Sequence, residues 1–144
     1  MADKILIVDD DPDMLMVLRW ALSPVGDLLE ACEGRGALRL IAEERPRLIL
    51  LDVAMPGMSG IEVLRRAREI DPTAIIVMLT GLCDIEIAKE ALDGGARAYV
   101  TKPFDDAYLR NEVRRLLEIT RKKPPTGDSD SDGDSGRPWR VRGG

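Results

Sequence analysis

Four short apolar runs of this chain each lead into side chains that could take part in chemistry. These side chains are Asp9 and Asp10 after ILIV, Asp52 after LILL, Thr80 after IIVML, and Lys102 just after AYVT. Runs that are apolar throughout are typical of strands buried on both faces of a parallel sheet. Because ligands of open parallel sheets bind beyond the carboxyl ends of the strands, we expect these side chains to meet in one crevice.

The chemistry of such a crevice follows from its charges. Neighbouring carboxylates repel one another unless a cation neutralises them, and a site of oxygen ligands with room for water suits Mg²⁺ better than zinc or copper. A lysine amine and a threonine hydroxyl could stabilise the charge on a transferring phosphoryl group. The remaining carboxylate could act as the nucleophile and form an aspartyl-phosphate. These residue types therefore predict Mg²⁺-dependent phosphoryl transfer.

The elements that must position these residues alternate along the chain. Apolar, strand-like runs are followed by segments with helical spacing of apolar residues, which predicts an α/β fold of repeated βα units. Asp11 stands before Pro12, and we expect its side chain to cap the first helix. The predicted strands begin near 5, 28, 48, 75 and 98, and the predicted helices cover about 12–22, 36–44, 60–71, 85–92 and 105–120.

Length and composition describe a globular chain. Its 144 residues and 15.9 kDa correspond to about one domain, and a hydrophobic content of 44% is ordinary for a folded protein. The net charge of −5 and the pI near 4.9 argue against nucleic acid as the main ligand. The lack of histidine excludes histidine-based catalysis and histidine metal ligands within this chain.

We expect a cytoplasmic protein with no membrane association. The longest unbroken apolar run, residues 74–79, is far shorter than the roughly 20 residues that span a bilayer. The start of the chain has no apolar segment of the secretory kind. Cys32 and Cys83 lack the spacing of metal or redox motifs, so we interpret them as buried or incidental thiols.

Residues 124–144 differ in composition from the rest of the chain. They are rich in glycine, serine, aspartate and arginine, and such a segment buries too little apolar surface to order itself. Asp128, Asp130 and Asp132 match the first half of a calcium-binding loop, but Trp139 stands where that loop needs its closing glutamate. We therefore interpret this segment as a flexible acidic, glycine-rich tail or linker, and we expect the folded domain to cover 1–123.

The segments ILIVDDDPDM, LILLDVAMPGMSG, VMLTG and AYVTKPF resemble the receiver domain of two-component response regulators. The resemblance extends over about 4–120, in the order and spacing of the family. It implies a flavodoxin-like (βα)5 fold, in which a doubly wound, five-stranded parallel sheet of order 2-1-3-4-5 carries helices on both faces.

The resemblance also implies a role for each acidic residue. Asp52 resembles the phosphoacceptor of the family. Asp10, and Asp9 through a water molecule, resemble the acidic pair that holds Mg²⁺. Asp52 itself and the backbone carbonyl of Ala54 would complete the protein ligands of the metal.

Three further residues match the family's phosphoryl-binding and switching positions. Lys102 resembles the lysine that pairs with the phosphoryl group, and the resemblance implies a cis peptide bond between Lys102 and Pro103. Thr80 resembles the hydroxyl that moves toward the phosphoryl oxygens. Tyr99 resembles the aromatic side chain that turns inward with it, although a half-buried tyrosine that never switches is an alternative interpretation.

The function implied by the resemblance is a phosphorylation-activated signalling switch. A histidine kinase or a histidine phosphotransfer protein would donate the phosphoryl group. The output would pass to a protein target through the face made by the fourth helix, the last strand and the last helix. On this view the protein is not an enzyme, and it catalyses at most its own phosphorylation and dephosphorylation.

Three alternatives remain open from the sequence. One is an Mg²⁺-dependent phosphohydrolase with an aspartate nucleophile, but enzymes that resemble the haloacid dehalogenase group carry a second acid where this chain has Ala54. The second is a receiver that only binds partners, which the intact set of site residues disfavours. The third is a receiver that acts as a phosphorelay component or as a fragment of a larger regulator.

Two apolar positions near the site suggest slow loss of the phosphoryl group. Ala54 and Leu82 follow Asp52 and Thr80 by two residues, and neither offers a polar side chain that could orient a hydrolytic water. We therefore expect a longer phosphorylated lifetime than in relatives with polar residues at both positions.

Overall fold

The computed structural model describes residues 2–81 and 85–121, which form one sheet flanked by helices. Five parallel strands lie in the order β2-β1-β3-β4-β5, as the resemblance implied. The elements are β1 (Lys4–Val8), α1 (Pro12–Leu22), β2 (Asp27–Ala31), α2 (Gly34–Glu44), β3 (Leu48–Asp52), α3 (Gly60–Ile70), β4 (Ile75–Thr80), α4 (Ile85–Asp93), β5 (Ala98–Thr101) and α5 (Asp106–Arg121).

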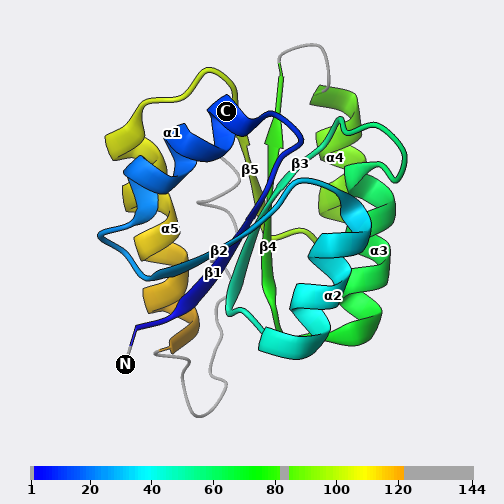
Figure 1. Cartoon of the computed structure of the whole chain (residues 1–144), viewed down its shortest axis with the longest axis horizontal. Helices are drawn as coiled ribbons and strands as arrows, with labels where there is room; N and C mark the ends of the chain where they lie inside the picture. The colour runs from blue at the N-terminus through cyan, green and yellow to red at the C-terminus, as the bar shows by residue number, and fades with distance from the viewer. Residues whose placement is uncertain (1, 82–84, 122–144) are drawn as a thin grey trace.

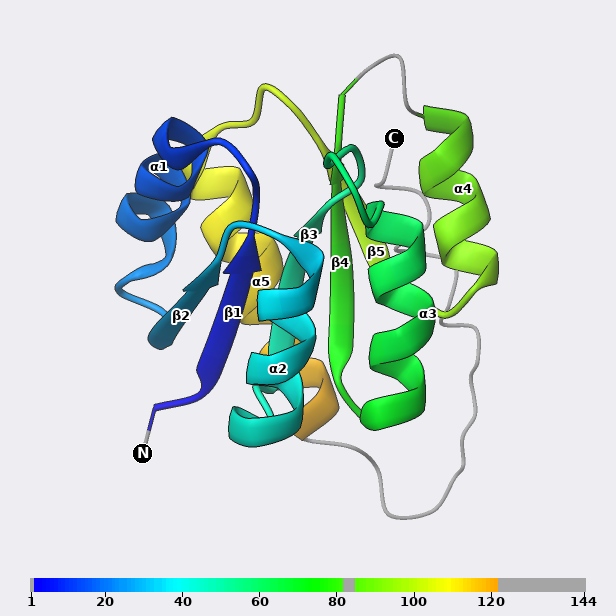
Figure 2. The same ribbon diagram turned by 45° about the vertical axis from the view of Figure 1, so that its right-hand side comes forward.

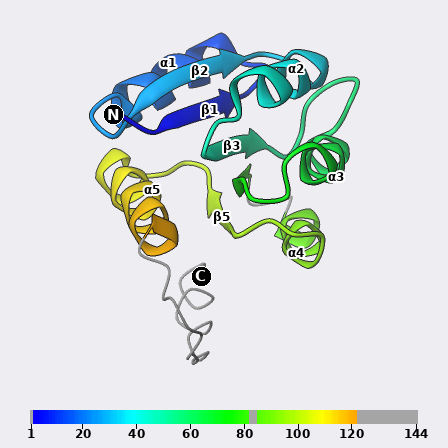
Figure 3. The same ribbon diagram turned by 90° about the horizontal axis from the view of Figure 1, so that it is seen from below.

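Helices cover both faces of the sheet. Figure 1 shows α1 and α5 on one side and α2, α3 and α4 on the other, and the view from below in Figure 3 shows the same two layers. The carboxyl ends of the strands lie along the upper edge in Figures 1 and 2, and the N-terminus and the end of α5 lie toward the lower edge. The predicted doubly wound α/β architecture is therefore confirmed.

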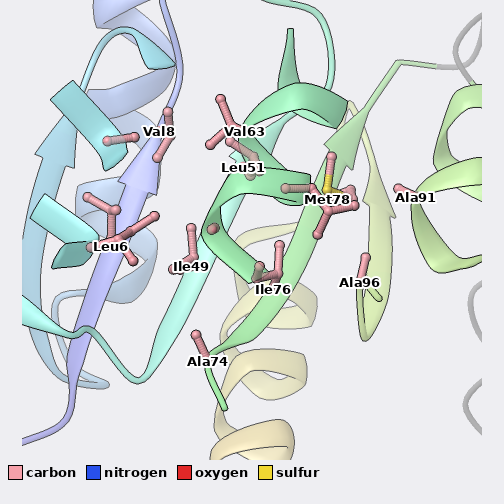
Figure 4. Packing of buried hydrophobic residues seen from close by; sticks show 14 of the residues in the cluster. Leu6, Val8, Ile49, Leu51, Val63, Ala74, Ile76, Met78, Ala91 and Ala96 are labelled. Carbon is pink, nitrogen blue, oxygen red and sulfur yellow. The ribbon is translucent and has the colours of Figure 1, made fainter. Parts of the chain in front are cut away.

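The apolar strands form this fold because each of their faces meets a helical layer. In β1, Leu6 packs into the cluster under α2, α3 and α4, whereas Ile5 and Ile7 pack into the cluster under α1 and α5. Figure 4 shows the first cluster, in which Ile49 of β3 lies beside Leu6 and Ile76 of β4 lies beside Ile49. Strands buried on both faces have no polar alternation, which explains the continuous apolar runs in the sequence.

The helix boundaries agree with the sequence except at one start. Asp11 caps α1 by accepting a hydrogen bond from the backbone N–H of Asp13 at 3.0 Å, as predicted. The second helix begins at Gly34 rather than near Gly36. The residue before it, Glu33, makes no side-chain cap, so the sequence carried no capping signal there.

Several sequence expectations concern residues outside those the structure describes. They are the character of the 124–144 segment, the apolar position Leu82 and the thiol of Cys83. The thiol of Cys32 is free and exposed, so of the two interpretations offered for it the buried one is wrong. In the two described stretches, every helix is too short or too polar to cross a membrane.

Candidate functional site

Strand register brings the predicted site residues to one edge of the sheet. Asp9 directly follows β1, Asp52 is the last residue of the adjacent β3, and Thr80 is the last residue of β4. Thr80 pairs with Thr101 of β5, so Lys102 follows at the same level. The backbone N–H of Lys102 donates to the carbonyl of Thr80 at 2.7 Å, which holds the two strand ends together.

Lys102 connects the acidic residues of the two central strands. Its Nζ lies 3.1 Å from Oδ1 of Asp52 and 3.2 Å from Oδ2 of Asp9. These residues are 50 and 93 positions apart from Lys102 in sequence, so the contacts depend on the sheet order. The structure therefore brings together the amine and two of the predicted acids.

Asp9, Asp10 and Asp52 form a compact group of carboxylates. Each offers one oxygen that lies within 4.8 Å of the others. Asp9 and Asp52 are buried, with 1% and 5% of their surface exposed, whereas Asp10 is exposed. Oδ1 of Asp9 also accepts a hydrogen bond from the backbone N–H of Asp11 at 2.9 Å, which fixes the Asp9 side chain at the start of α1.

The charges of this group are not balanced. Burial, and then the charge of Asp9, raise the pKa of Asp52 above its ordinary value, although the hydrogen bond from Lys102 acts in the opposite direction. Burial by itself disfavours the charged amine, but the hydrogen bond and charge of Asp52 together with Asp9 raise the pKa of Lys102. One ammonium group among three carboxylates leaves an excess of negative charge.

This donor set fits a hard divalent cation. Carboxylate oxygens close together, with one of them exposed to water, are what Mg²⁺ prefers, because it keeps several waters and takes few protein ligands. In the described residues, no turn or loop hydrogen bond uses the backbone carbonyl of Ala54, so that oxygen is available as well. The residues present are thus able to hold such a metal.

Thr80 is buried beside this group but is bonded elsewhere. Only 1% of its surface is exposed, and its hydroxyl donates to the carbonyl of Gly81 at 3.0 Å. Tyr99 lies on β5 opposite Met78 of β4 and is half-buried against the cluster under α2, α3 and α4. Among the described residues, the Tyr99 hydroxyl makes no hydrogen bond.

Gly60 fixes how closely α3 approaches the end of β3, whereas the sequence predicted it only as the start of a helix. Its N–H donates to the carbonyl of Val53 at 3.0 Å, and a Cβ at this position would collide with the backbone carbonyl of Asp52 and with Val53 Cα. Only glycine lets α3 begin so close to the end of β3. A glycine just after the Ser59 cap, where the helix itself needs none, was the available signal.

Two smaller features complete the geometry. The Lys102–Pro103 peptide bond is cis, as the resemblance implied. The side chain of Ala54 is exposed, whereas Leu82 lies outside the described residues, so the expected long lifetime of a phosphoryl group stays a prediction.

Comparison with known families gives one consistent result. The model of the response regulator receiver domain matches residues 5–114 of this chain. The matched stretch includes all four strand ends described above.

Curated relatives fall into short and long proteins. Sporulation initiation phosphotransferase F of Bacillus subtilis is 35% identical over 120 residues, which cover 83% of this chain and 97% of the relative. The transcriptional regulatory protein KdpE of Mycobacterium tuberculosis is 40% identical over 132 residues, which cover 88% of this chain and 58% of the relative. The chain thus spans almost all of the first and little more than half of the second.

A solved structure gives the same fold. The response regulator receiver domain protein (CheY-like) from Methanospirillum hungatei superposes with a TM-score of 0.81 at 30% identity. The match covers 86% of this chain and all of that protein.

Proposed function

Because this chain belongs to the receiver domain family of two-component response regulators, we propose that it is a phosphorylation-activated signalling switch with Asp52 as the phosphoacceptor. The observation that carries this assignment is the state of the Asp52 carboxylate. It is buried at a strand end, Oδ1 is held by Lys102, and among the described residues Oδ2 accepts no hydrogen bond. That oxygen is positioned by the backbone and remains available as a nucleophile.

The proposed step moves a phosphoryl group from a donor histidine to Asp52. An oxygen of the Asp52 carboxylate attacks the phosphorus, the P–O bond forms, and the N–P bond of the phosphohistidine breaks. The leaving imidazole takes up a proton from solvent. The raised pKa of Asp52 means that a nearby cation helps to keep the carboxylate ionised for this attack.

Lys102 and Thr80 are the proposed ligands of the transferred group. The ammonium of Lys102 already lies 3.1 Å from Asp52, so it can neutralise phosphoryl oxygens attached there without a large movement. The Thr80 hydroxyl would exchange its bond to the Gly81 carbonyl for a bond to a phosphoryl oxygen. This exchange is the first movement that phosphorylation would impose on the protein.

We assign Mg²⁺ to the carboxylate group of the site. Asp9, Asp10 and Asp52 would hold it together with the backbone carbonyl of Ala54, and the excess of negative charge among these residues supports the assignment. When bound, the ion would supply positive charge to the phosphoryl oxygens.

We propose that phosphorylation changes the target-binding surface through Tyr99 of β5. The Tyr99 hydroxyl makes no hydrogen bond among the described residues, and Tyr99 lies opposite Met78, two residues before Thr80. A movement of Thr80 would open space into which Tyr99 can turn. We therefore propose that the protein target docks on the face made by α4, β5 and α5.

We propose the partners, the domain bounds and the cellular setting with the family match over residues 5–114 as support. The donor is a histidine kinase or a histidine phosphotransfer protein, the domain covers 1–123, and the protein acts in the cytoplasm. It performs no catalysis beyond its own phosphorylation and dephosphorylation.

A phosphorelay role is the second candidate. The near-complete span of a relative named as a phosphotransferase favours it, since that relative has little chain outside the domain. Incubating the phosphorylated protein with unphosphorylated histidine phosphotransfer proteins tests the relay. Transfer of label to one of them would support it, and loss of label only to water would contradict it.

Phosphotransfer from purified, autophosphorylated histidine kinases tests the switch. We expect label on the wild-type protein when Mg²⁺ is present, and none on the Asp52→Asn variant. Asp71→Asn is the matched control, because Asp71 is also a buried aspartate but lies at the opposite edge of the sheet. Label retained by Asp52→Asn would refute the assignment.

A further inference from the structure

The amino-terminal edge of the sheet carries a depression lined by arginines. It has a volume of about 960 Å³ and lies between the loops that precede β3, β4 and β5. Its cationic lining consists of Arg45, Arg47, Arg68 and Arg97, and Asp71 is the acidic residue among its lining residues. Figure 3 views the molecule from this side. The depression is thus at the opposite edge from Asp52.

Three of these arginines donate hydrogen bonds to neutral groups, and one of them is Arg45, which donates to the carbonyl of Ile70 at 3.3 Å. Arg47 donates to the carbonyl of Leu117 at 3.2 Å and to the hydroxyl of Thr120, and Arg68 donates to the carbonyl of Pro72 at 2.7 Å. Carbonyl and hydroxyl oxygens satisfy hydrogen bonds, but they do not cancel a positive charge. The guanidinium groups are therefore held in place around the depression while their charge persists.

The acids nearby neutralise only part of this charge. Arg47 pairs with Asp3 at 3.3 Å, and Arg45 makes a longer contact of 3.8 Å with Asp71. The side chain of Arg97 is exposed and makes no hydrogen bond or ion pair in the described residues. Four arginines face two acids, which leaves a surplus of positive charge.

The chain itself carries an acidic segment a few residues beyond α5, the helix whose end lines this depression. Thr120 lines the depression, α5 ends at Arg121, and the sequence continues from there. Residues 128–134 read DSDSDGD and carry four aspartates in seven positions. Asp128 is seven residues beyond Arg121, a distance that an extended chain spans over about 24 Å.

We propose that the acidic segment 128–134 docks into the arginine-lined depression of its own domain. Each contact between exposed charges is weak, but the short connection to α5 holds the segment at a millimolar effective concentration. The repeated aspartates match the surplus charge of the depression. Docking would join this segment to α5 and to the starts of β4 and β5, the strands that lead to Thr80 and Lys102 at their other ends.

Paramagnetic relaxation in the 1–144 chain tests the proposal. A nitroxide is attached to a Ser131→Cys variant in which Cys32 and Cys83 are replaced by serine. The comparison protein carries the same label and Asp→Asn substitutions at 128, 130, 132 and 134. At low salt we expect the relaxation enhancement of the Ala74 and Arg97 amides to be at least about twofold larger with the aspartates, and the difference to vanish in 1 M salt, where the Debye length is ~3 Å.

A pair of double variants tests the other side of the contact. Arg45→Gln with Arg97→Gln removes the two arginines without hydrogen bonds to α5 or to the loop before β4, and we expect it to abolish the extra enhancement at Ala74. Arg65→Gln with Arg66→Gln is the matched control, because these residues pair with Glu62 on the exposed side of α3 and the charge change is the same.

Two results would overturn the proposal. One is an equal relaxation enhancement of the Ala74 and Arg97 amides with and without the aspartates. This result is expected if the connection to α5 alone brings the label near, or if the aspartates pair with the arginines of residues 137–142 instead. The other result concerns added pyrophosphate, followed by the NMR chemical shifts of the Ala74 and Arg97 amides. If pyrophosphate shifts these amides equally in the proteins with and without the aspartates, the segment does not compete for the depression, which would then be a site for a free anion.

Discussion

The two edges of the sheet hold charged clusters of opposite sign, and the clusters differ in how far their charges are buried. At the carboxyl edge, Asp9 and Asp52 are buried and share one ammonium group. At the amino edge, Arg47 and Arg68 are anchored by backbone carbonyls, and Arg45 is 59% exposed at its side chain. The first cluster concentrates uncompensated charge in a small buried volume, and the second spreads it over a wide, solvated surface.

This difference in burial indicates that the carboxyl edge, rather than the amino edge, is suited to a specific cation. Buried like charges are costly unless a cation or a covalent change neutralises them, so the carboxyl edge has stored repulsion that a metal can relieve. Solvated arginines cost little, and their contacts are weak and sensitive to salt.

Loss of Lys102 should give the largest change. Lys102→Met leaves Asp9 and Asp52 buried without a cation, and we expect it to lower the free energy of unfolding by about 2–3 kcal/mol at neutral pH without divalent ions. Lys4→Met breaks an exposed pair with Glu44 and should cost less than about 0.5 kcal/mol. Urea unfolding measures both, and equal losses would contradict the contrast between buried and exposed charge.

The close approach of α3 to β3 should give the next effect. Gly60→Ala forces its methyl group against the backbone at Asp52, and we expect a loss of about 2 kcal/mol. Gly36→Ala lies in α2, where the nearest atoms leave room for a methyl group, and should stabilise by about 0.5–1 kcal/mol. Thermal unfolding distinguishes the two, and a neutral Gly60→Ala would mean that the start of α3 is not fixed by this contact.

Magnesium should stabilise the carboxyl edge. With free Mg²⁺ at tenfold its dissociation constant, we expect the free energy of unfolding to rise by about 1.4 kcal/mol. Asp10→Asn should reduce this gain, and Asp13→Asn, which changes an acid in the first turn of α1 outside the carboxylate group, should preserve it. A gain of the same size in both variants, measured by thermal shift, would count against the proposed metal ligands.

Removing the buried carboxylate of Asp52 should stabilise the metal-free protein, whereas removing Lys102 destabilises it. Because burial and Asp9 raise the pKa of Asp52, the folded protein binds this proton more tightly than the unfolded chain. The stability it contributes is therefore lost as the pH rises from the ordinary aspartate range through the raised value. Asp52→Asn should stabilise the metal-free protein by about 1 kcal/mol at neutral pH and flatten this pH dependence.

Asp71→Asn provides the comparison from the amino edge. Oδ1 of Asp71 accepts hydrogen bonds from the N–H and hydroxyl of Thr73, at 3.1 and 2.7 Å, and an asparagine oxygen can still accept them. The Asp71→Asn variant loses the 3.8 Å ion pair with Arg45, and we expect its free energy of unfolding to be unchanged or slightly lower. Urea unfolding over a range of pH measures both variants, and stabilisation of similar size by Asp71→Asn would remove the distinction between the edges.

Most of the fold was predictable from the sequence, because continuous apolar runs and helical spacing require two covering layers. The residues gathered around Lys102 were predictable for the same reason, since each stands at the end of such a run. The start of α2 was not, because Glu33 makes no side-chain cap. The close contact at Gly60 depends on how α3 approaches β3, a tertiary property that local spacing does not carry.

The arginine-lined depression could not be anticipated for a different reason. Arg45 and Arg47 come from the connection between α2 and β3, Arg68 from the last turn of α3, and Arg97 from the connection before β5. Only the sheet order brings these three segments to one place. No short motif links them in the sequence. The site at the carboxyl edge differs because its residues follow strands in a recognisable order.

The most direct test of the central claim is to locate the phosphoryl group on the chain. The protein is phosphorylated by a histidine kinase in the presence of Mg²⁺, the acyl phosphate is trapped by reduction with borohydride, and the modified peptide is sequenced by mass spectrometry. We expect the modification at Asp52 and at no other acid of the group. Modification at Asp9 or Asp10, with Asp52 unmodified, would contradict the account.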